Sequence, residues 1–435
     1  MIPIKRINES DPDFEKQLDE LSDSTNVDDS VLAGEVSEII DAVKLRGDDA
    51  LIEFTNRFDK RNVKIDEIEV PYGRLEEATG KISTELLQSL RFAAERIRSF
   101  HEHQKIESWK YQDKEGFELG QQVTALDRVG VYVPGGKAAY PSTVLMNAIP
   151  AKIAEVNEII MVVPAPRGEL NEMVLASAYI SGVDRVFTIG GAQAIAAMAF
   201  GTATVPKVDK IVGPGNRYVA EAKRLVFGKV GIDMIAGPSE VLILNDGSGD
   251  PDWIAMDMFA QAEHDEDARA ILVGTNSEFI DQVSDSINKL LPQMERSEII
   301  KHSLEKNGVI IQVGDLDMAV MVINKLAPEH VQLPIEDPES IVAKIKHAGA
   351  IFLGHYAAES LGDYCAGPSH VLPTSGTARF SSPLGVYDFQ KRTSVIKCDA
   401  DSATSVNQAS STLARGEGLT AHALSAEYRM KGEKK

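Results

Sequence analysis

The residues with the clearest chemical potential lie in Gln261-Ala262-Glu263-His264, at the end of an apolar run that begins near Asp252. If this run is helical, Gln261 and His264 stand three residues apart on one face, so an amide oxygen and an imidazole nitrogen point the same way. Such a pair supplies half of a metal site. Two ligands cannot hold an ion tightly, so the hypothesis requires further nitrogen or oxygen ligands elsewhere in the chain.

Polar clusters further along the chain offer such ligands. In Ala327-Pro328-Glu329-His330 a carboxylate stands beside an imidazole just after a helical pattern, which the proline ends. Such a pair can relay protons, although a Glu-His dipeptide is more often structural. The Gly/Pro-rich loop at 362–370 and the segment 417–422 add more carboxylates and imidazoles. A nitrogen and oxygen set suited to zinc or another divalent first-row ion would comprise Gln261, His264, Asp363 and His422.

The elements that must position these residues alternate between short β-branched runs and helical patterns. Strands are predicted at 129–133, 159–163, 185–189 and 210–212, each followed by a helix, at 143–156, 171–180, 193–200 and 217–226. A second alternation has strands at 241–244, 270–273, 309–313 and 350–353, and amphipathic helices are expected upstream at 31–51 and 86–100. Successive βα units predict parallel sheets covered by helices on both faces. The sequence therefore predicts two α/β lobes with a ligand cleft between them.

Glycine-rich turns end the predicted strands of the first lobe. They are Pro134-Gly135-Gly136, Gly190-Gly191-Ala192-Gln193 and Gly213-Pro214-Gly215-Asn216. Such turns bring backbone N–H groups and helix N-termini close to a ligand, as a pyrophosphate requires. The full dinucleotide fingerprint is absent, because the third glycine is missing and no acidic residue can be assigned to the ribose. The pattern fits a cofactor site and ordinary tight turns equally well.

Length and composition limit the classes of function. A chain of 435 residues with 43% apolar residues exceeds the size of a single core. The formal net charge of −21 disfavours nucleic acid and anionic membranes as partners. No stretch is long and apolar enough to span a bilayer or resembles a secretory signal, so a cytoplasmic location is expected. The only two cysteines, Cys365 and Cys398, are too few for a disulfide framework or a cysteine-based zinc site.

Six separated motifs resemble the histidinol dehydrogenase family, in the family's order and at matching spacings over nearly the whole chain. They are Ile232-Asp-Met-Ile-Ala-Gly-Pro-Ser239-Glu240, Gln261-Ala-Glu-His264, Ala327-Pro-Glu329-His330, Gly362-Asp363-Tyr364, His370-Val-Leu-Pro-Thr374 and Glu417-Gly-Leu-Thr-Ala-His422. Each motif alone is weak, but chance agreement of all six is negligible.

The resemblance implies a zinc enzyme that oxidises L-histidinol to L-histidinaldehyde and then to L-histidine, using two NAD in succession. It implies zinc ligands at Gln261, His264, Asp363 and His422, one ion per subunit, with the zinc gripping the substrate's amine and imidazole. By the same resemblance, His330 takes the hydroxyl proton and Glu329 activates the water that attacks the aldehyde. Further substrate contacts are implied at Ser239, His370 and Glu417, and NAD contacts at Tyr132, Gln193 and Asn216.

The resemblance also implies a homodimer in which Glu417 and His422 enter the active site of the neighbouring subunit. The expected architecture is α/β, with two Rossmann-like, incompletely doubly wound lobes of parallel sheet. Its expected parts are an N-terminal arm (1–25), a catalytic zinc lobe (26–131 and 239–384), an NAD lobe (132–238) and a C-terminal dimerisation segment (385–435).

Oxidation of an aldehyde by hydride transfer requires a tetrahedral adduct, formed by a thiolate or by an activated water. Cys365 lies two residues from Asp363 and suggests the first route. Because no His or Lys is adjacent in sequence to activate this thiol, we favour a packed, unreactive cysteine and a water activated by Glu329.

Three alternatives remain open at the level of sequence. The first is a dehydrogenase of the same family acting on a sulfonated diol, although His370, Glu417 and His422 favour the imidazole substrate. The second is a zinc hydrolase in which Glu329 activates a metal-bound water. The third is a noncatalytic dimer stabilised by metal.

Overall fold

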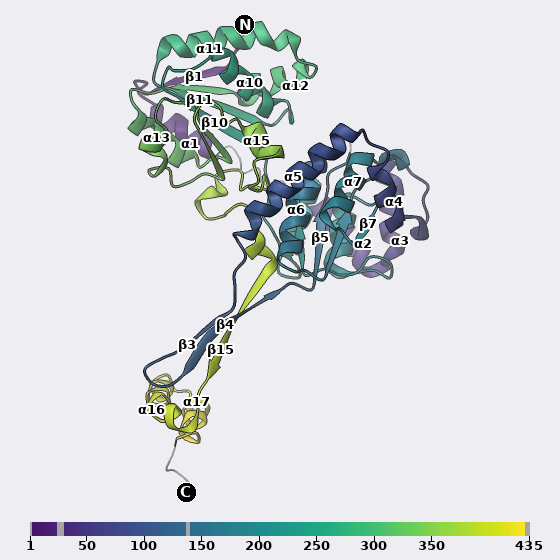
Figure 1. Cartoon of the computed structure of the whole chain (residues 1–435), viewed down its shortest axis with the longest axis vertical. Helices are drawn as coiled ribbons and strands as arrows, with labels where there is room; N and C mark the ends of the chain where they lie inside the picture. Colours follow the sequence, from purple (N-terminus) through teal and green to yellow (C-terminus); the bar gives the residue numbers. More distant parts are fainter. Residues whose placement is uncertain (1, 24–29, 136–139, 431–435) are drawn as a thin grey trace.

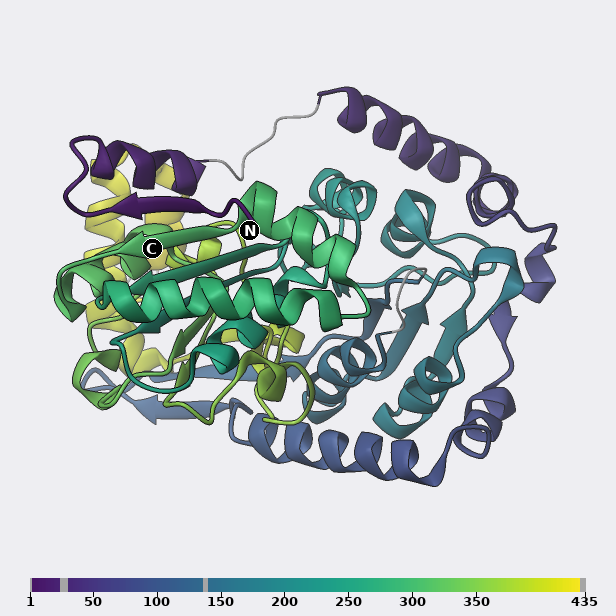
Figure 2. The same cartoon turned by 90° about the horizontal axis from the view of Figure 1, so that it is seen from above.

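The computed structural model describes residues 2–23, 30–135 and 140–430. The chain forms two α/β lobes and a long arm that ends in two helices (Figure 1). The predicted fold class is confirmed, with one parallel and one mainly parallel sheet, each covered by helices on both faces (Figure 2). Within the described residues, no helix combines the length and apolar character needed to cross a membrane.

The first lobe is built on a six-stranded sheet of order β2-β7-β6-β5-β8-β9, parallel except for β2. Its strands are β2 (Glu69–Val70), β5 (Arg128–Tyr132), β6 (Glu158–Val162), β7 (Arg185–Phe187), β8 (Lys210–Val212) and β9 (Gly231–Ile232). One face is covered by α4 (Tyr72–Thr79), α5 (Thr84–Glu102), α6 (Pro141–Ile153) and α7 (Glu172–Ser181). The other face is covered by α2 (Ser30–Arg46), α3 (Asp48–Asp59), α8 (Gly191–Phe200) and α9 (Arg217–Val226).

The second lobe is built on an all-parallel sheet of order β1-β12-β11-β10-β13-β14. Its strands are β1 (Lys5–Asn8), β10 (Glu240–Asn245), β11 (Arg269–Gly274), β12 (Val309–Gln312), β13 (His330–Leu333) and β14 (Ala350–Leu353). One core contains residues of α1 (Phe14–Asp23), α13 (Leu316–Leu326) and α14 (Glu339–Val342). The opposite core contains α10 (Pro251–Ala262), α11 (Ser277–Leu290) and α12 (Ser297–Asn307), and α15 (Glu359–Tyr364) contacts α10.

The arm is an antiparallel sheet of order β15-β4-β3, formed by β3 (Trp109–Gln112), β4 (Glu118–Ala125) and β15 (Gln390–Lys397). It ends in α16 (Ala400–Gly416) and α17 (Thr420–Glu427), far from both lobes in Figure 1. Short 3-10 turns occur at Ile65–Glu67, Pro166–Gly168, Leu291–Gln293, Thr377–Arg379 and Val386–Phe389.

The packing differs from the expected grouping of residues 26–131 with 239–384. Helices α2 to α5 cover the first-lobe sheet, and β5 lies inside that sheet. The N-terminal residues supply β1, which pairs with β12 at the edge of the second-lobe sheet. The expected helix at 31–51 is divided at Gly47, where α2 ends and α3 begins. These differences arise from contacts between segments distant in sequence, which local periodicity does not encode.

The connection between the lobes decides which sheet edges face each other. Strand β9 ends at Ile232 on the carboxyl edge of the first sheet, and β10 begins at Glu240 on the amino edge of the second. Only residues 233–239 join them. The glycine-rich turns of the first lobe therefore lie across this short link from the strand beginnings of the second.

Candidate active site

Glu329 and His330 lie at the amino edge of the second sheet, both tied to the backbone of Glu240. His330 opens β13 between β10 and β14, a strand that periodicity did not predict. Its Nδ1 lies 3.1 Å from the carbonyl oxygen of Glu240, and the Glu240 N–H donates to Oε2 of Glu329 at 2.9 Å. Both side chains are buried, at 5% and 6% exposure. The pair is thus held rigidly at the start of two adjacent strands.

The predicted pair on α10 meets Asp363 of α15 at the same edge. Gln261 lies in the last turn of α10, whereas His264 lies beyond the helix end at Ala262, in a turn where its N–H donates to the Gln261 carbonyl at 3.2 Å. His264 Nε2 is 3.8 Å from Asp363 Oδ2, and 37% of the His264 side chain is exposed. Gln261 is fully buried, yet neither its Oε1 nor its Nε2 has a hydrogen-bond partner. An unpaired buried amide is costly, so this group is suited to a ligand that the protein chain itself does not provide.

Glu359 is a site residue that the sequence reasoning missed. It starts α15 and stands four residues before Asp363, a helical spacing that places both carboxylates on one face and could have revealed it. Its side chain is 2% exposed, Oε1 lies 3.9 Å from His330 Nδ1, and Oε2 has no hydrogen-bond partner. One ligand atom from each of three residues lies within 4.8 Å of the others, namely His330, Glu359 and Asp363.

Burial dominates the electrostatics of this cluster. It raises the pKa of Glu329 and of Glu359 well above the usual range, and nearby carboxylates raise both further. Burial also raises the pKa of Asp363, which the charge of His264 partly offsets. The imidazoles respond oppositely, because burial lowers the pKa of His330 to about 3 and that of His370 to about 4. Crowded buried carboxyls beside neutral imidazoles form a donor set that fits a divalent cation.

The remaining predicted substrate contacts of the lobes border the same edge. His370 has its Nδ1 3.0 Å from the backbone oxygen of Asp363. Ser239 ends the link between the lobes and immediately precedes β10. The predicted residues Ser239, Gln261, His264, Glu329, His330, Asp363 and His370 are therefore all carried by elements that meet at this edge.

Glu417 and His422 are not brought to this cluster. Glu417 caps α16 and His422 lies in α17, both exposed at the tip of the arm. Within one chain, the fourth predicted metal ligand therefore lies remote from the other three (Figure 1).

The carboxyl edge of the first lobe carries a tight glycine turn and the N-termini of α8 and α9. Gly213 has φ +108°, and an added Cβ would lie 2.1 Å from the carbonyl oxygen of Tyr132. Asn216 caps α9 by accepting from the N–H groups of Tyr218 and Val219. Gln193, at the start of α8, is buried with Oε1 unpaired. These features fit a dinucleotide approaching backbone N–H groups at helix N-termini.

The side chain of Tyr132 is almost completely buried, so that little of it is open to a ligand. Its side chain is 3% exposed, its hydroxyl accepts from the Gly191 N–H at 3.1 Å, and burial raises its pKa to about 12. The hydroxyl hydrogen remains available as a donor at the strand end. Part of the predicted turn after β5 lies outside the described residues.

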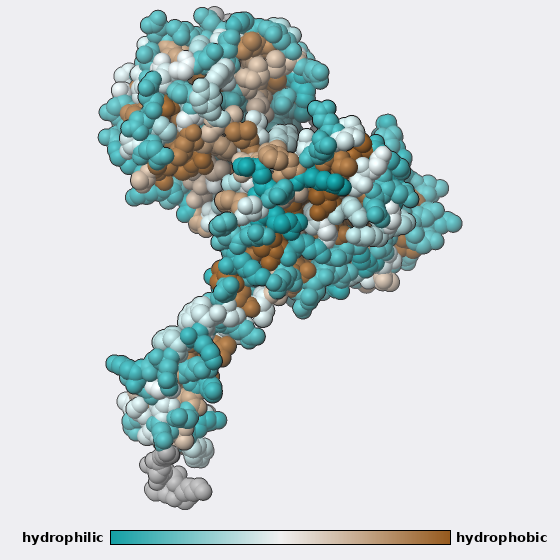
Figure 3. Space-filling model, viewed as in Figure 1, coloured by the Kyte–Doolittle hydropathy of each residue, from teal (hydrophilic) through white to brown (hydrophobic). Residues whose placement is uncertain are grey.

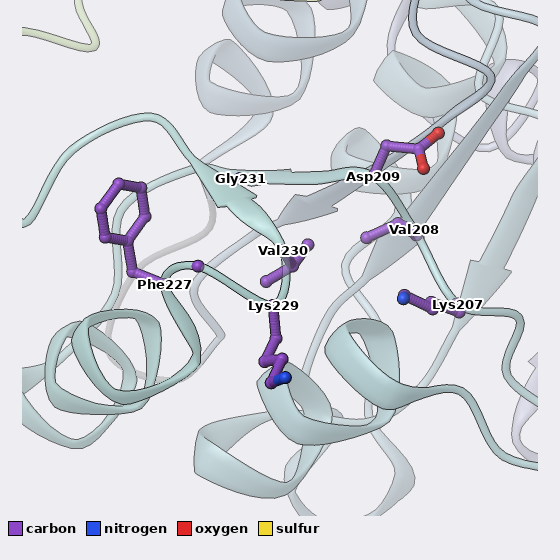
Figure 4. Close-up of a pocket in the computed structure, with 8 residues that line it drawn as sticks. Lys207, Val208, Asp209, Phe227, Lys229, Val230 and Gly231 are labelled. Carbon is purple, nitrogen blue, oxygen red and sulfur yellow. The ribbon is translucent and has the colours of Figure 1, made fainter. Parts of the chain in front are cut away.

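An open hollow on the first lobe lies at the opposite edge of its sheet. It is lined by Lys207, Asp209, Phe227 and Lys229, which precede the starts of β8 and β9 (Figure 4). It is therefore separate from the glycine-rich turns.

Comparison with known proteins assigns the family. The histidinol dehydrogenase family model matches residues 22–430. The chain belongs to the histidinol dehydrogenase family. Curated histidinol dehydrogenases from Pseudomonas aeruginosa and Methylococcus capsulatus are 62% and 60% identical to it, each over 99% of this chain and 98% and 99% of their own lengths.

Solved structures agree with this assignment. A histidinol dehydrogenase from Elizabethkingia anophelis has a TM-score of 0.92 at 33% identity, with 98% of each chain covered. An acetylating aldehyde dehydrogenase from Geobacillus thermoglucosidasius, at 14% identity and a TM-score of 0.50, covers 90% of this chain and 98% of its own and shares the fold alone. The chain is an oxidoreductase of the histidinol dehydrogenase family, which decides against the hydrolase and the noncatalytic dimer.

Proposed function

We propose that this enzyme performs the zinc-dependent, two-step oxidation of L-histidinol to L-histidine through L-histidinaldehyde, using two NAD. The observation that carries the proposal is the unpaired, fully buried amide of Gln261, one turn from His264 and its partner Asp363. A zinc ion held by these residues and by His422 of a second subunit would orient the substrate's amine and imidazole. Four ligands of this kind suit zinc.

His330 would take the hydroxyl proton. Because its Nδ1 faces the Glu240 carbonyl, Nδ1 carries the hydrogen and Nε2 is left as the acceptor. The carboxylates of Glu329 and Glu359 lie 3.7 and 3.9 Å from Nδ1 and would stabilise the imidazolium that forms. NAD, which Tyr132, Gln193 and Asn216 at the glycine-rich turns would hold, would supply the hydride acceptor.

Glu329 would activate the water that attacks the aldehyde. Its Oε2 is fixed by the Glu240 N–H, which leaves the other oxygen to accept a proton. Burial raises the pKa of Glu329, and a divalent cation in the cluster would lower it again, allowing the carboxylate to act as a base. Ser239 and His370 would contact the substrate at the same edge.

The arm supports the proposal of a homodimer with shared sites. It exposes large apolar side chains along β3, β15 and α16 and at both ends of α17, and Figure 3 shows such patches on its surface. They include Trp109, Tyr111, Ile396, Leu413, Leu419 and Tyr428. Exposed apolar surface of this kind marks interfaces, and docking on a second copy would carry Glu417 and His422 into that copy's cleft.

The carboxyl edge of the first sheet and the amino edge of the second would have different roles. The first lobe would hold NAD, the second lobe the metal and substrate, and residues 385–435 the partner subunit. The enzyme would act in the cytoplasm as part of histidine biosynthesis.

The decisive experiment is NADH formation on addition of L-histidinol, followed at 340 nm. We expect two NADH per histidinol, loss of activity after chelation and recovery with zinc. A sulfonated diol oxidised in preference to histidinol would contradict the proposed substrate, and activity that survives complete chelation would contradict the proposed metal.

A further inference from the structure

The short segment that follows α3 is locked in place over the first-lobe sheet. Lys60 ends the helix in the left-handed conformation, with φ +53°. The amide of Asn56 both donates to the Val63 carbonyl at 3.0 Å and accepts from the Val63 N–H at 2.9 Å. The Arg61 N–H also donates to the Asn56 carbonyl at 3.1 Å. The turn is therefore rigid in its own right.

This turn places Asp59 at the carboxyl end of β6. Its Oδ2 accepts from the N–H of Ala165 at 3.3 Å, and the residue is 9% exposed. On the neighbouring strand end, Arg61 Nη1 donates to the carbonyl and hydroxyl oxygens of Thr188 at 2.9 and 3.0 Å. Asp59 is also close enough to Tyr132 for its charge to raise the pKa of that phenol, after the larger effect of burial.

The position of Asp59 matches a requirement of dinucleotide folds. The strand order reverses between β5 and β8, where the Gly213 turn lies. In such folds an acidic residue beyond the next strand binds the hydroxyls of the adenosine ribose. Here that strand is β6, and the following residues, Val163-Pro-Ala-Pro-Arg167, contain no carboxylate. Asp59 reaches the same place from a helix outside the βαβ unit.

Cations border the same position. A surface hollow, which begins at the residue after Asp59, is lined by Lys60, Arg61 and Arg167 together with Glu67. A phosphate on the ribose would meet these cations but would be repelled by Asp59. The carboxylate is thus the group that disfavours a 2′-phosphorylated cofactor.

We propose that Asp59 binds the adenosine ribose hydroxyls of the dinucleotide and selects NAD over NADP. This inference rests on the proposed use of NAD. It adds a specificity residue that lies more than 60 residues before the first glycine-rich turn of the cofactor lobe.

The test measures binding directly. Calorimetric titration of the zinc-loaded protein with NAD, NADP and ADP-ribose would compare the wild type, Asp59→Asn and the control Asp66→Asn, which changes an exposed carboxylate of the 3-10 turn at Ile65–Glu67. Asp59→Asn should weaken the binding of NAD and of ADP-ribose about tenfold, as expected for the loss of a charged hydrogen bond. The ratio of the NAD affinity to the NADP affinity should fall by at least the same factor. The affinity of Asp59→Asn for histidinol should equal that of the wild type. The affinities of Asp66→Asn for NAD, NADP and ADP-ribose should also equal those of the wild type.

A chemical cycle separates recognition from a purely structural role. An NAD analogue whose adenosine ribose lacks the 2′-hydroxyl should bind the wild type about tenfold more weakly than NAD, and Asp59→Asn should discriminate little between the two. If the wild type binds both equally, Asp59 does not bind this hydroxyl, whether or not the variant folds. If the wild type binds NAD and Asp59→Asn binds it with the same affinity, this inference alone is overturned. If the wild type neither binds nor reduces NAD, the proposed function is overturned as well.

Discussion

At the scale of single residues, the site combines groups whose neighbours are fixed by the backbone of one strand. Glu240 uses its N–H to hold Glu329 and its carbonyl to hold His330. Both side chains are therefore oriented by the start of β10. This arrangement favours separate roles for the two side chains in two successive oxidations.

Glu329→Gln should stall the second oxidation, because the amide can still accept from Glu240 but cannot take a proton from water. We expect the conversion of added histidinaldehyde to fall by a factor of about 10² to 10⁴, with the first hydride transfer preserved in single-turnover measurements. Cys365→Ser is the matched control and should retain most turnover, since this partly buried thiol packs against the first-lobe core. A folded, zinc-loaded serine variant without activity would instead indicate a thiol adduct.

Asp257 on α10 gives a prediction about pH, because burial raises its pKa to about 7. Between pH 3.8, the usual pKa of the group, and about pH 7, the folded state binds more protons than the unfolded state. The free energy of unfolding therefore falls as pH rises through this range. In metal-free protein, Asp257→Asn should gain stability relative to wild type from pH 4 to 7 and level off above, by roughly 4 kcal/mol at most. Urea midpoints at several pH values measure this; a difference independent of pH would contradict it.

At the scale of elements, the proposed cofactor edge depends on a buried ion pair between α9 and the link that follows β9. Lys223 and Asp233 are each 2% exposed and directly paired. Lys223 Nζ also donates to the Gly213 carbonyl at 3.0 Å, and Asp233 Oδ2 accepts from the Gly213 N–H at 2.8 Å. One pair thus fixes both sides of the tight glycine turn and the beginning of the passage to the second lobe.

Lys223→Met should destabilise the protein by about 3 to 5 kcal/mol, because it leaves the Asp233 carboxylate buried without its cation. The double variant Lys223→Met with Asp233→Asn should recover part of this loss, since no charge remains unpaired. Lys289→Met provides the contrast, because its ion pair with Asp252 is exposed and screened by solvent, so its loss should change stability little. Equal losses for both lysine variants, measured by denaturant unfolding, would show that the buried pair does not stabilise this turn.

At the scale of the whole molecule, three of the four proposed metal ligands lie in the second lobe and the fourth lies at the far end of the arm. Gln261, His264 and Asp363 meet at the amino edge of the second sheet, whereas His422 is exposed beyond β15. The partly exposed imidazole of His264 leaves an approach for a group from outside the lobe. In the proposed homodimer with shared sites, activity would therefore require subunit association.

Subunit mixing tests this link. His264→Asn and His422→Asn proteins should each be nearly inactive, but an equal mixture allowed to exchange subunits should recover roughly a quarter of wild-type activity, because half of the dimers carry one intact site. Mixing two preparations of the same variant is the control. Absence of recovery, with exchange verified by mass-tagged subunits, would count against a shared site.

Much of the architecture and most of the candidate site followed from the sequence alone. Strong βα alternation gave all eight expected strands, and α9 has the predicted bounds, because these elements have clear local periods. The spacing of Gln261 and His264 indicated half of a metal site, and the six separated motifs indicated the family.

Only the tertiary structure decided which distant segments share a lobe or a site. The pairing of β1 with β12, the carboxylate of Glu359 beside His330 and the placement of Asp59 at the end of β6 depend on contacts across many residues. The seven-residue link 233–239 decided that the carboxyl edge of one sheet adjoins the amino edge of the other. Local patterns determine which elements form, but burial and backbone pairing determine which of their ends meet, and the candidate chemistry lies at those ends.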